Sequence, residues 1–319
     1  MPALLPPREL RQRFVAEATA KFARNVPDFV RLQQLIAARG GRFVNDHGAI
    51  RTADPQLAAL FVRAARVLGL HRDRDYLFPA KRLRSFDLQV PGDDAQAFKI
   101  FVSEVDLAAF PPPVAALIRD DCAAQAAAVD HTAFIAQIGK AEAAGGLAEA
   151  DARAFIRHFC EVLMARSGPP LKRATLDAVA AESGEAASAL ALGPDFNHVT
   201  VDVTAAGFGG IEAMAAAMQA AGLVLLPAIQ GAPGSMLRQT ATMAATMATP
   251  VIEADGRTGS ASTEKQFVEI IERGPARDAD GAVLWTDDGQ PRTYRHFLAA
   301  NAEQIFGAAA TRSRPSPGG

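Results

Sequence analysis

Two histidines and one glutamate stand in three short segments of the chain and together make a ligand set for a metal ion. His47 lies in NDHGAIR, His198 in DFNHVTVDV and Glu269 in KQFVEIIERG. Each segment is typical of a β-strand. Two imidazoles and one carboxylate suit a non-haem Fe(II) centre, which keeps open positions for a substrate and for dioxygen. The hypothesis requires the fold to bring these three side chains together.

The neighbours of these residues also allow purely structural roles. Alternation puts Thr200 on the strand face of His198 and Asn197 on the opposite face. A histidine there could equally be satisfied by a backbone carbonyl, and His47 could be a turn residue. Glu269 stands among apolar residues, and a buried carboxylate without a partner is costly, so we expect a cation opposite it. That cation is either a metal ion or an arginine.

Arg51 follows His47 by four positions in the first segment. Residues four apart on a strand point to the same face and lie about 13 Å from each other. The planar guanidinium suits a carboxylate, so we expect Arg51 to bind the far end of an acid whose other end is held at the metal. Arg238 and Gln239, at the end of the loop QGAPGSMLRQT, are further candidates for substrate contacts.

Two copies of a strand-helix-strand-strand-strand unit would position these residues. The order fits residues 198–273, with a short apolar strand at GLVLLPA and a strand pair around a turn in MLRQTATMAATMATPVIEA. Residues 42–106 permit the same order. The first and last strands of each unit could then present one ligand each to a shared cavity. In the first unit the last strand carries Glu104, which is therefore a rival ligand.

Other stretches of the chain flank these two units, and the Ala-rich helical stretch between them contains no recognisable strand. We expect six segments: N-terminal helices over 1–41, a first unit over 42–110, a helical insert over 111–190, a second unit over 191–275, a C-terminal loop and helix over 276–310, and a disordered tail over 311–319.

Composition argues against several classes of function. The formal net charge is -2 and charged residues make up 21%, so no global field favours nucleic acid or an acidic membrane surface. Apolar runs such as 220–229 are too short to span a bilayer, and the N-terminus lacks the pattern of a secretory signal. Cys122 and Cys160 suit free thiols in a reducing compartment. We expect a cytoplasmic protein.

Four of the motifs resemble one enzyme family. HGAIR, FNHVT, LRQTAT and FVEIIERG resemble the 2-oxoadipate dioxygenase/decarboxylases, first catalogued as a domain of unknown function. The last strand is also similar to the F-x-E-I-I-x-R strand of 4-hydroxyphenylpyruvate dioxygenase, a member of the vicinal oxygen chelate superfamily. The resemblance implies metal ligands at His47, His198 and Glu269 and a substrate-binding, catalytic arginine at Arg51.

For the reaction, the resemblance implies an Fe(II) enzyme that converts 2-oxoadipate and dioxygen to 2-hydroxyglutarate and carbon dioxide without an external reductant. The expected fold is α+β, with two vicinal oxygen chelate-like βαβββ units that form a partly closed sheet around the metal. Two other functions stay open. One is a non-redox isomerase or lyase with a divalent ion, often held by four protein ligands. The other is a metal-free module that binds a small acid.

Overall fold

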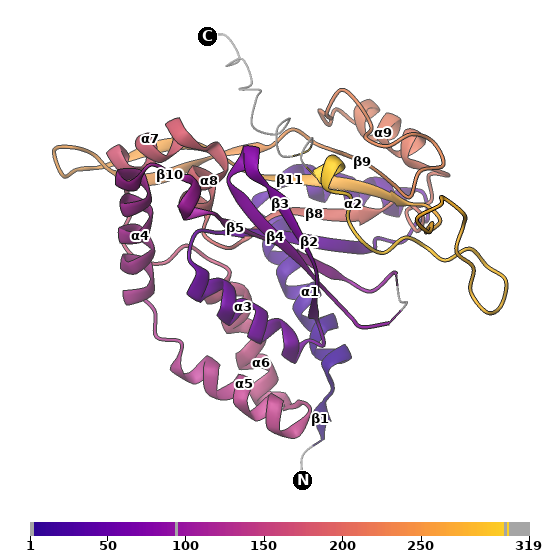
Figure 1. The fold of residues 1–319 in the computed structure, drawn as a ribbon, viewed down its shortest axis with the longest axis horizontal. Helices are drawn as coiled ribbons and strands as arrows, with labels where there is room; N and C mark the ends of the chain where they lie inside the picture. Colours follow the sequence, from indigo (N-terminus) through magenta and orange to yellow (C-terminus); the bar gives the residue numbers. More distant parts are fainter. Residues whose placement is uncertain (1–2, 93–94, 303–304, 306–319) are drawn as a thin grey trace.

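One large mixed sheet with helices on both faces forms the α+β fold of the computed structural model, which describes residues 3–92, 95–302 and 305 (Figure 1). The strands of this sheet are β2 (Asn45–Thr52), β3 (His71–Phe78), β4 (Leu83–Gln89), β5 (Lys99–Val105), β7 (Leu171–Lys172), β8 (Phe196–Asp202), β9 (Leu237–Ala241), β10 (Ala245–Ile252) and β11 (Thr258–Arg273). A separate pair consists of β1 (Leu4–Leu5) and β6 (Leu147–Ala148).

Helices account for most of the remaining structure. The α-helices are α1 (Pro7–Asn25), α2 (Pro27–Ala38), α3 (Pro55–Val67), α4 (Pro112–Ala127), α5 (Thr132–Ala144), α6 (Glu149–His158), α7 (Arg173–Glu182), α8 (Gly184–Leu192) and α9 (Ile211–Ala220). Single turns are η1 (Pro79–Lys81), η2 (Leu107–Ala109) and the π-helical η3 (Phe159–Leu163). Each of α1 to α4 begins at a proline, whose fixed φ suits the first turn. No helix in the described part of the chain is long and apolar enough to cross a membrane.

The strand order shows two related units. It runs β3-β4-β5-β2-β8-β11-β10-β7, with β9 paired to β11 beside β10. In both halves the first strand of the unit pairs in parallel with the last, and the last pairs antiparallel with the one before it. The antiparallel pair β2–β8 joins the halves. This arrangement confirms the α+β expectation of two βαβββ units, and the sheet stays open.

Three details of the sequence-based prediction are wrong. The segment GLVLLPA is no regular strand, because only Leu225 forms an isolated bridge there, with Thr242. β9 and β10 do not pair with each other around a turn, since both pair with the long strand β11. The helical insert contributes two short strands, β6 and β7. The tail predicted over 311–319 lies outside the described residues.

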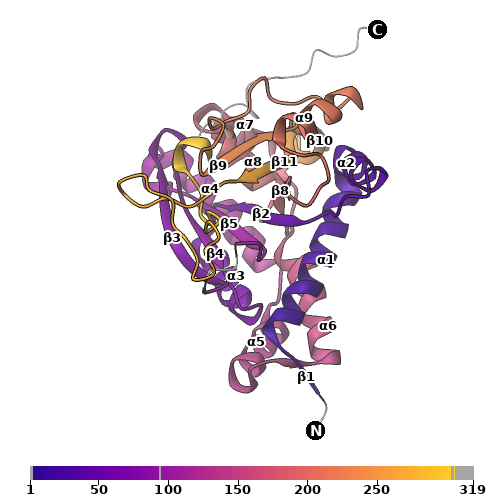
Figure 2. The ribbon, with the colours of Figure 1, turned by 90° about the vertical axis from the view of Figure 1, so that its right-hand side faces the viewer.

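The two faces of the sheet have different partners. On one face, α1 packs against β8 and α3 packs against β2 and β5, and this face holds the largest apolar core. On the other face, α8 packs against β2 and β11. A second core there includes Ala49, Phe101 and Phe297. Figure 2, turned by 90°, shows α1, α3 and α6 in the lower part of the molecule and α7 and α8 in the upper part, with β2 between them.

Candidate metal centre

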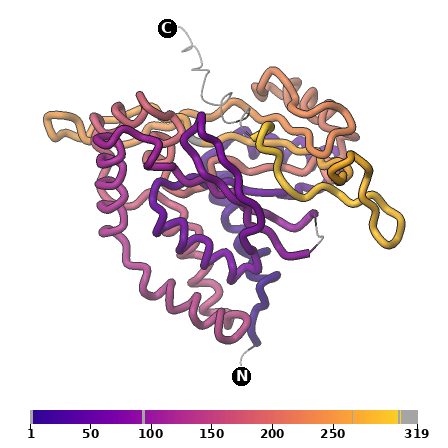
Figure 3. Tube along the Cα trace, in the orientation of Figure 1, coloured from indigo at the N-terminus to yellow at the C-terminus, as the bar shows by residue number. Residues whose placement is uncertain are grey.

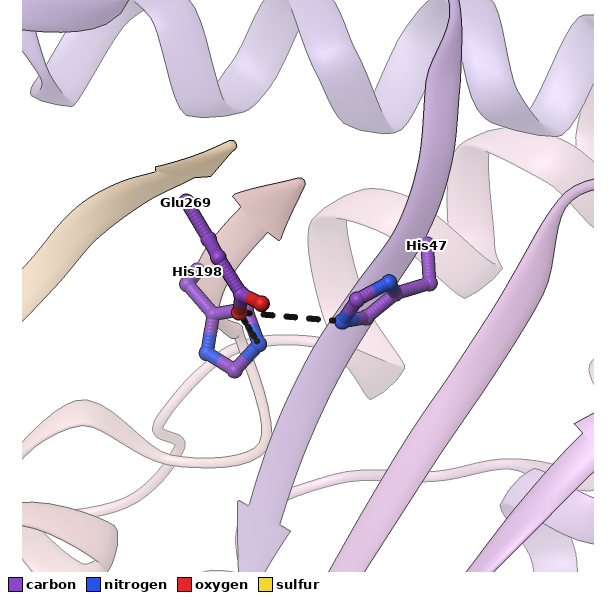
Figure 4. Close-up of side chains that lie close together, drawn as sticks. All are labelled: His47, His198 and Glu269. Carbon is purple, nitrogen blue, oxygen red and sulfur yellow. Dashed lines mark ion pairs between the residues drawn. The ribbon is translucent and has the colours of Figure 1, made fainter. Parts of the chain in front are cut away.

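The structure brings His47, His198 and Glu269 together on the second face of the sheet. Their ligand atoms all lie within 4.8 Å of one another, and the three residues are 2%, 4% and 3% exposed. Glu269 Oε2 is 3.3 Å from His198 Nε2 and 3.8 Å from His47 Nε2. Figure 4 shows the carboxylate pointing between the two imidazoles, each from a different strand. The three form a preassembled site with the size and donor types of a metal centre.

A β-bulge orients His47. The pairing of β2 with β8 runs from Asn45↔Val201 directly to His47↔Thr200, so Asp46 is the extra residue. Asp46 therefore lies on the same face as His47, and its Oδ1 is 2.8 Å from His47 Nδ1. The Nδ1–H group donates to Asp46, which leaves the lone pair of Nε2 toward Glu269. A carboxylate behind the ring in this way fixes the tautomer of a metal-binding histidine.

Two buried cations neutralise Asp46. Arg273, at the end of β11, donates from Nε and Nη2 to its two oxygens at 2.6 and 2.7 Å. The Nζ of Lys99 is 3.6 Å from Oδ2 of Asp46. Burial alone would raise the pKa of Asp46, but these charges and hydrogen bonds hold it well below the ordinary value. Asp46 is thus a permanent carboxylate.

The two histidines of the triad have the protonation state that metal binding requires, whereas Glu269 retains its proton to a higher pH than an ordinary carboxyl group. Burial lowers the pKa of His47. Burial also holds the pKa of His198 well below the ordinary value, and the neighbouring imidazole of His47 and guanidinium of Arg51 act in the same direction. Both rings are therefore neutral, as metal ligands must be. Burial, helped by the negative charge of Asp46, raises the pKa of Glu269 to about 8. The hydroxyl of Thr200 lies 3.3 Å from Oε2 of Glu269 and 3.0 Å from Nε2 of His47, and its one proton can be donated to either acceptor. Donation to Glu269 favours the ionised form of the carboxylate.

A second bulge corrects the prediction for Asn197. The pairing steps from Ala49↔His198 to Ile50↔Phe196, so Asn197 is the extra residue of β8. Phe196 remains in the core on the opposite face, where its ring meets that of Phe14. Asn197 consequently faces the same side as His198, because a bulge interrupts the alternation that the sequence suggests.

Arg51 and Asn197 line a cavity of about 390 Å³ between β11, α7 and α8. Arg51 shares its strand face with His47 and is 9% exposed. Oδ1 of Asn197 is buried without a hydrogen-bond partner among the described residues. Phe267 also lines the cavity, and its ring stacks on His198 with centroids 4.7 Å apart. The ring of Phe267 therefore lies between the triad and this cavity, whose wall includes the cation of Arg51 and the amide of Asn197.

The space directly at the triad is small and mostly apolar. It measures about 20 Å³ and is lined by the three ligands together with Phe101, Gln239, Phe297, Leu298, Ala302 and Ile305. The ring of Phe297 stands edge-on to His47, with centroids 4.8 Å apart. Residues from the C-terminal part of the chain thus cover the centre with apolar side chains.

Two other sequence-predicted residues lie away from the triad. Arg238 points to the opposite side of β9 from Gln239 and forms ion pairs with Glu212 and Glu272. Glu104 is paired with Thr52 and does not belong to the group around the triad. Neither residue is brought to the centre, whereas Gln239 is.

The β2–β8 register explains why Glu104 is not the counterpart of Glu269. The pairs His47↔Thr200 and Ala49↔His198 relate the two histidines by an approximate two-fold axis. Glu269 pairs with Thr200, so its counterpart must pair with Ala49, and that residue is Phe101. Glu104 is three positions further along β5 and points to the other face.

Sequence reasoning missed the residues that support the ligands. The position of Asp46 directly before His47 was the one feature of the sequence that could have indicated its role. The bulge that turns Asp46 to the site, however, is set by strand pairing. Arg273 shares a face with Glu269 by simple alternation, four residues on. Its partner Asp46 is 227 positions away, and no local pattern connects the two.

Comparison with known proteins identifies the family that the chain matches. Over residues 12–289 the chain matches the family described as 2-oxoadipate dioxygenase/decarboxylase. A protein from Ralstonia eutropha assigned to the glyoxalase superfamily is 22% identical with a TM-score of 0.75, with 85% of each chain covered. No curated protein sequence matches the chain.

Two hydroxyglutarate synthases, both solved in complex with 2-oxoadipate, have the same fold. The Oryza sativa enzyme is 18% identical with a TM-score of 0.70, with 97% of this chain and 96% of that chain covered. The Pseudomonas putida enzyme is 20% identical with a TM-score of 0.69, and the covered shares are 87% and 67%. At these identities the structures establish the fold alone. The family match spans most of the chain, so the protein belongs to the 2-oxoadipate dioxygenase/decarboxylase family of oxidoreductases.

Proposed function

We propose that the protein is an Fe(II)-dependent dioxygenase that decarboxylates a 2-oxo acid, with 2-oxoadipate as the substrate and 2-hydroxyglutarate and carbon dioxide as the products. The observation that carries the proposal is the buried group of His47, His198 and Glu269. Family membership supports the reaction class. The 2-oxoadipate bound to two structures of the same fold supports the substrate.

The charge of the triad fits a divalent cation. Within the described part of the chain, the ion-pair contacts of Glu269 are with His47 and His198, and both rings are neutral. An almost fully buried carboxylate therefore lacks the positive charge that burial normally requires. The metal-free binding module would have needed an arginine opposite Glu269. Arg273, on the same strand, is instead engaged by Asp46.

Three protein ligands leave coordination positions for other molecules. Phe101 occupies the position related to Glu269 and has no donor atom, which argues against a four-ligand isomerase or lyase site. When bound, Fe(II) supplies positions for the 2-oxo acid and dioxygen and the redox chemistry of the reaction. Asp46 keeps Nε2 of His47 directed at the metal, and the apolar cover of Phe101 and Phe297 keeps water out.

Arg51 and Asn197 provide recognition at the other end of the substrate. With the 2-oxo-acid end at the triad, the distal carboxylate extends past Phe267 into the cavity that Arg51 lines. The guanidinium offers a charge-assisted contact there, and the amide of Asn197 offers a second polar group. Gln239, 4% exposed beside the triad, is proposed to contact the 2-oxo-acid end.

Replacement of one ligand at a time should remove the metal. We expect His47→Ala, His198→Ala and Glu269→Ala each to lose Fe(II) and turnover while remaining folded, since two protein ligands hold the ion weakly. Metal content after purification without chelator, together with circular dichroism, measures this. Arg238→Ala is the control and should retain metal, because Arg238 lies on the opposite side of β9. Full metal content in any of the triad variants would show that the ligands are assigned wrongly.

The uncompensated carboxylate should destabilise the metal-free protein. Because its pKa is about 8 when folded and near 4.5 when unfolded, Glu269 lowers the stability of the folded state as pH rises through that window. Glu269→Gln removes this penalty. In chelator, the variant should therefore gain stability over the wild type from pH 5 to pH 8, by up to about 3 kcal/mol at pH 7 at 1.36 kcal/mol per pKa unit. Denaturant unfolding at several pH values measures it, and a pH-independent difference would refute the charge argument.

Turnover of 2-oxoadipate should consume dioxygen and release carbon dioxide in equal amounts. No ascorbate-type reductant and no 2-oxoglutarate should be required, since the substrate itself supplies all four electrons, two by oxidative decarboxylation and two by hydroxylation of the shortened acid. An oxygen electrode and carbon dioxide trapping measure the ratio with the iron-loaded protein. Turnover under strict anaerobiosis would instead support the isomerase or lyase.

Specificity for a distal carboxylate should depend on Arg51. We expect Arg51→Ala to lower kcat/KM for 2-oxoadipate by orders of magnitude and to leave iron content intact, because one carboxylate then loses its buried partner. Arg51→Lys should restore activity only in part, since an ammonium cannot form the forked contact. The matched substrate 2-oxohexanoate, which has the same length and no distal carboxylate, should lose little further activity in Arg51→Ala. Equal losses on both substrates would assign Arg51 to the fold or the metal site.

A further inference from the structure

A C-terminal strap, residues 294–302, lies over the metal centre. Within it, Phe297 stands against the ring of His47, while Leu298 and Ala302 line the space at the triad. The strap follows the long loop 275–293, which projects at the right in Figure 3. The space left at the triad, about 20 Å³, is smaller than a six-carbon acid, so side chains that line it must move before substrate can reach the centre.

One guanidinium contacts both the metal site and the strap. Nε and Nη2 of Arg273 bind the carboxylate of Asp46, the hydrogen-bond partner of His47. Nη1 of Arg273 donates to the backbone carbonyls of Tyr294 and His296, both at 3.0 Å. Its Cζ lies 5.6 Å from the centre of the Phe297 ring, and the side chain is 2% exposed. Arg273 therefore lies between Asp46, the hydrogen-bond partner of His47, and the backbone of the strap.

We propose that Arg273 is a positioning residue that couples metal binding at His47 to the docking of the strap. The proposal rests on the proposed function only in that the triad binds a divalent metal. Coordination withdraws electron density from the His47 ring and makes its Nδ1–H a stronger donor to Asp46. A more firmly held Asp46 fixes the fork of Arg273, and Nη1 then holds the two carbonyls in place. By thermodynamic linkage, a docked strap also favours metal binding.

The planar fork is essential to this coupling. Arginine has five N–H donors in a fixed geometry, which lets one side chain serve a carboxylate on one edge and two carbonyls on another. A lysine keeps the positive charge beside Asp46 but is a compact point donor and cannot span both groups. Arg273→Lys therefore separates the coupling from the mere neutralisation of Asp46, which Lys99 also supports.

The strap provides a matched control. Arg295 anchors the same backbone from the other side, donating to Oε1 of Gln89 at 3.1 Å and to the carbonyl of Val90 at 3.3 Å. Its ion-pair partner is Asp73, and Asp46 has its own contacts with His47, Lys99 and Arg273. Arg295→Lys removes one anchor of the strap, while the contacts of Arg273 with Asp46 and with the strap remain, so the coupling to the metal site should stay intact.

The experiment measures metal affinity and strap exchange in the same full-length proteins. Co(II) and anaerobic Fe(II) titrations give the dissociation constants, and hydrogen exchange of the peptide containing residues 294–298 is followed with and without metal. In the wild type, metal should slow exchange of the strap. In Arg273→Lys, we expect metal affinity to fall about 10- to 100-fold, as for other partners of metal-binding histidines, and the metal-induced protection to disappear. In Arg295→Lys, affinity should stay within about twofold and the protection should persist.

Asp46→Asn keeps the proposal testable should Arg273→Lys not fold. The amide oxygen can still accept from His47, but the charge that fixes Arg273 is gone. Although Asp46 is on β2, far from the strap in sequence, its replacement should speed strap exchange. Unchanged affinity in Arg273→Lys, or metal-induced protection that persists in it, would overturn the coupling alone. A wild type that binds neither Co(II) nor Fe(II) would contradict the proposed function and the coupling with it.

Discussion

The antiparallel pairing of β2 with β8 sets the distance between the two histidines, and the rest of the centre depends on it. It joins the two βαβββ units and brings the rings of His47 and His198 to 5.5 Å. A slip of one residue would turn the candidate ligand of one strand to the opposite face of the sheet, where α1 and α3 pack. Gly48 helps to fix the register, because a Cβ atom there would lie 2.4 Å from the ring of Phe196. A side chain at this position would force the strands or the ring apart.

The same pairing separates two buried carboxylates into different roles. Asp46 has Arg273 and Lys99 beside it and stays ionised as a fixed support for His47. In the described part of the chain, the ion-pair and hydrogen-bond contacts of Glu269 are with the two imidazoles and Thr200, and none of these groups carries a positive charge. A fold that neutralised both carboxylates with its own cations would be more stable without metal and would bind metal less well.

The approximate two-fold relation between the units is broken at the triad, where the residue at the related position differs. The unit with His198 supplies Glu269, whereas the unit with His47 supplies Phe101 at the related position. A ring in that place leaves three candidate ligands and puts an apolar wall beside them. Arg51 and Asn197 line a separate cavity, formed between the sheet and the helical insert. The insert is thus part of the proposed recognition site, although it contributes almost nothing to the sheet.

The sequence by itself determined the candidate ligand types, the three strands that carry them and the two-unit α+β plan, because strand alternation and residue chemistry are local properties. It also placed Arg51 on the face of His47, since both lie on one regular strand. Tertiary structure alone decided what local alternation cannot reach. Two bulges turned Asp46 and Asn197 to the site, and strand register made Phe101 rather than Glu104 the counterpart of Glu269. Long-range packing put Arg273 between Asp46 and the C-terminal strap. Each of these depends on backbone pairing between segments far apart in the chain, which no window of sequence contains.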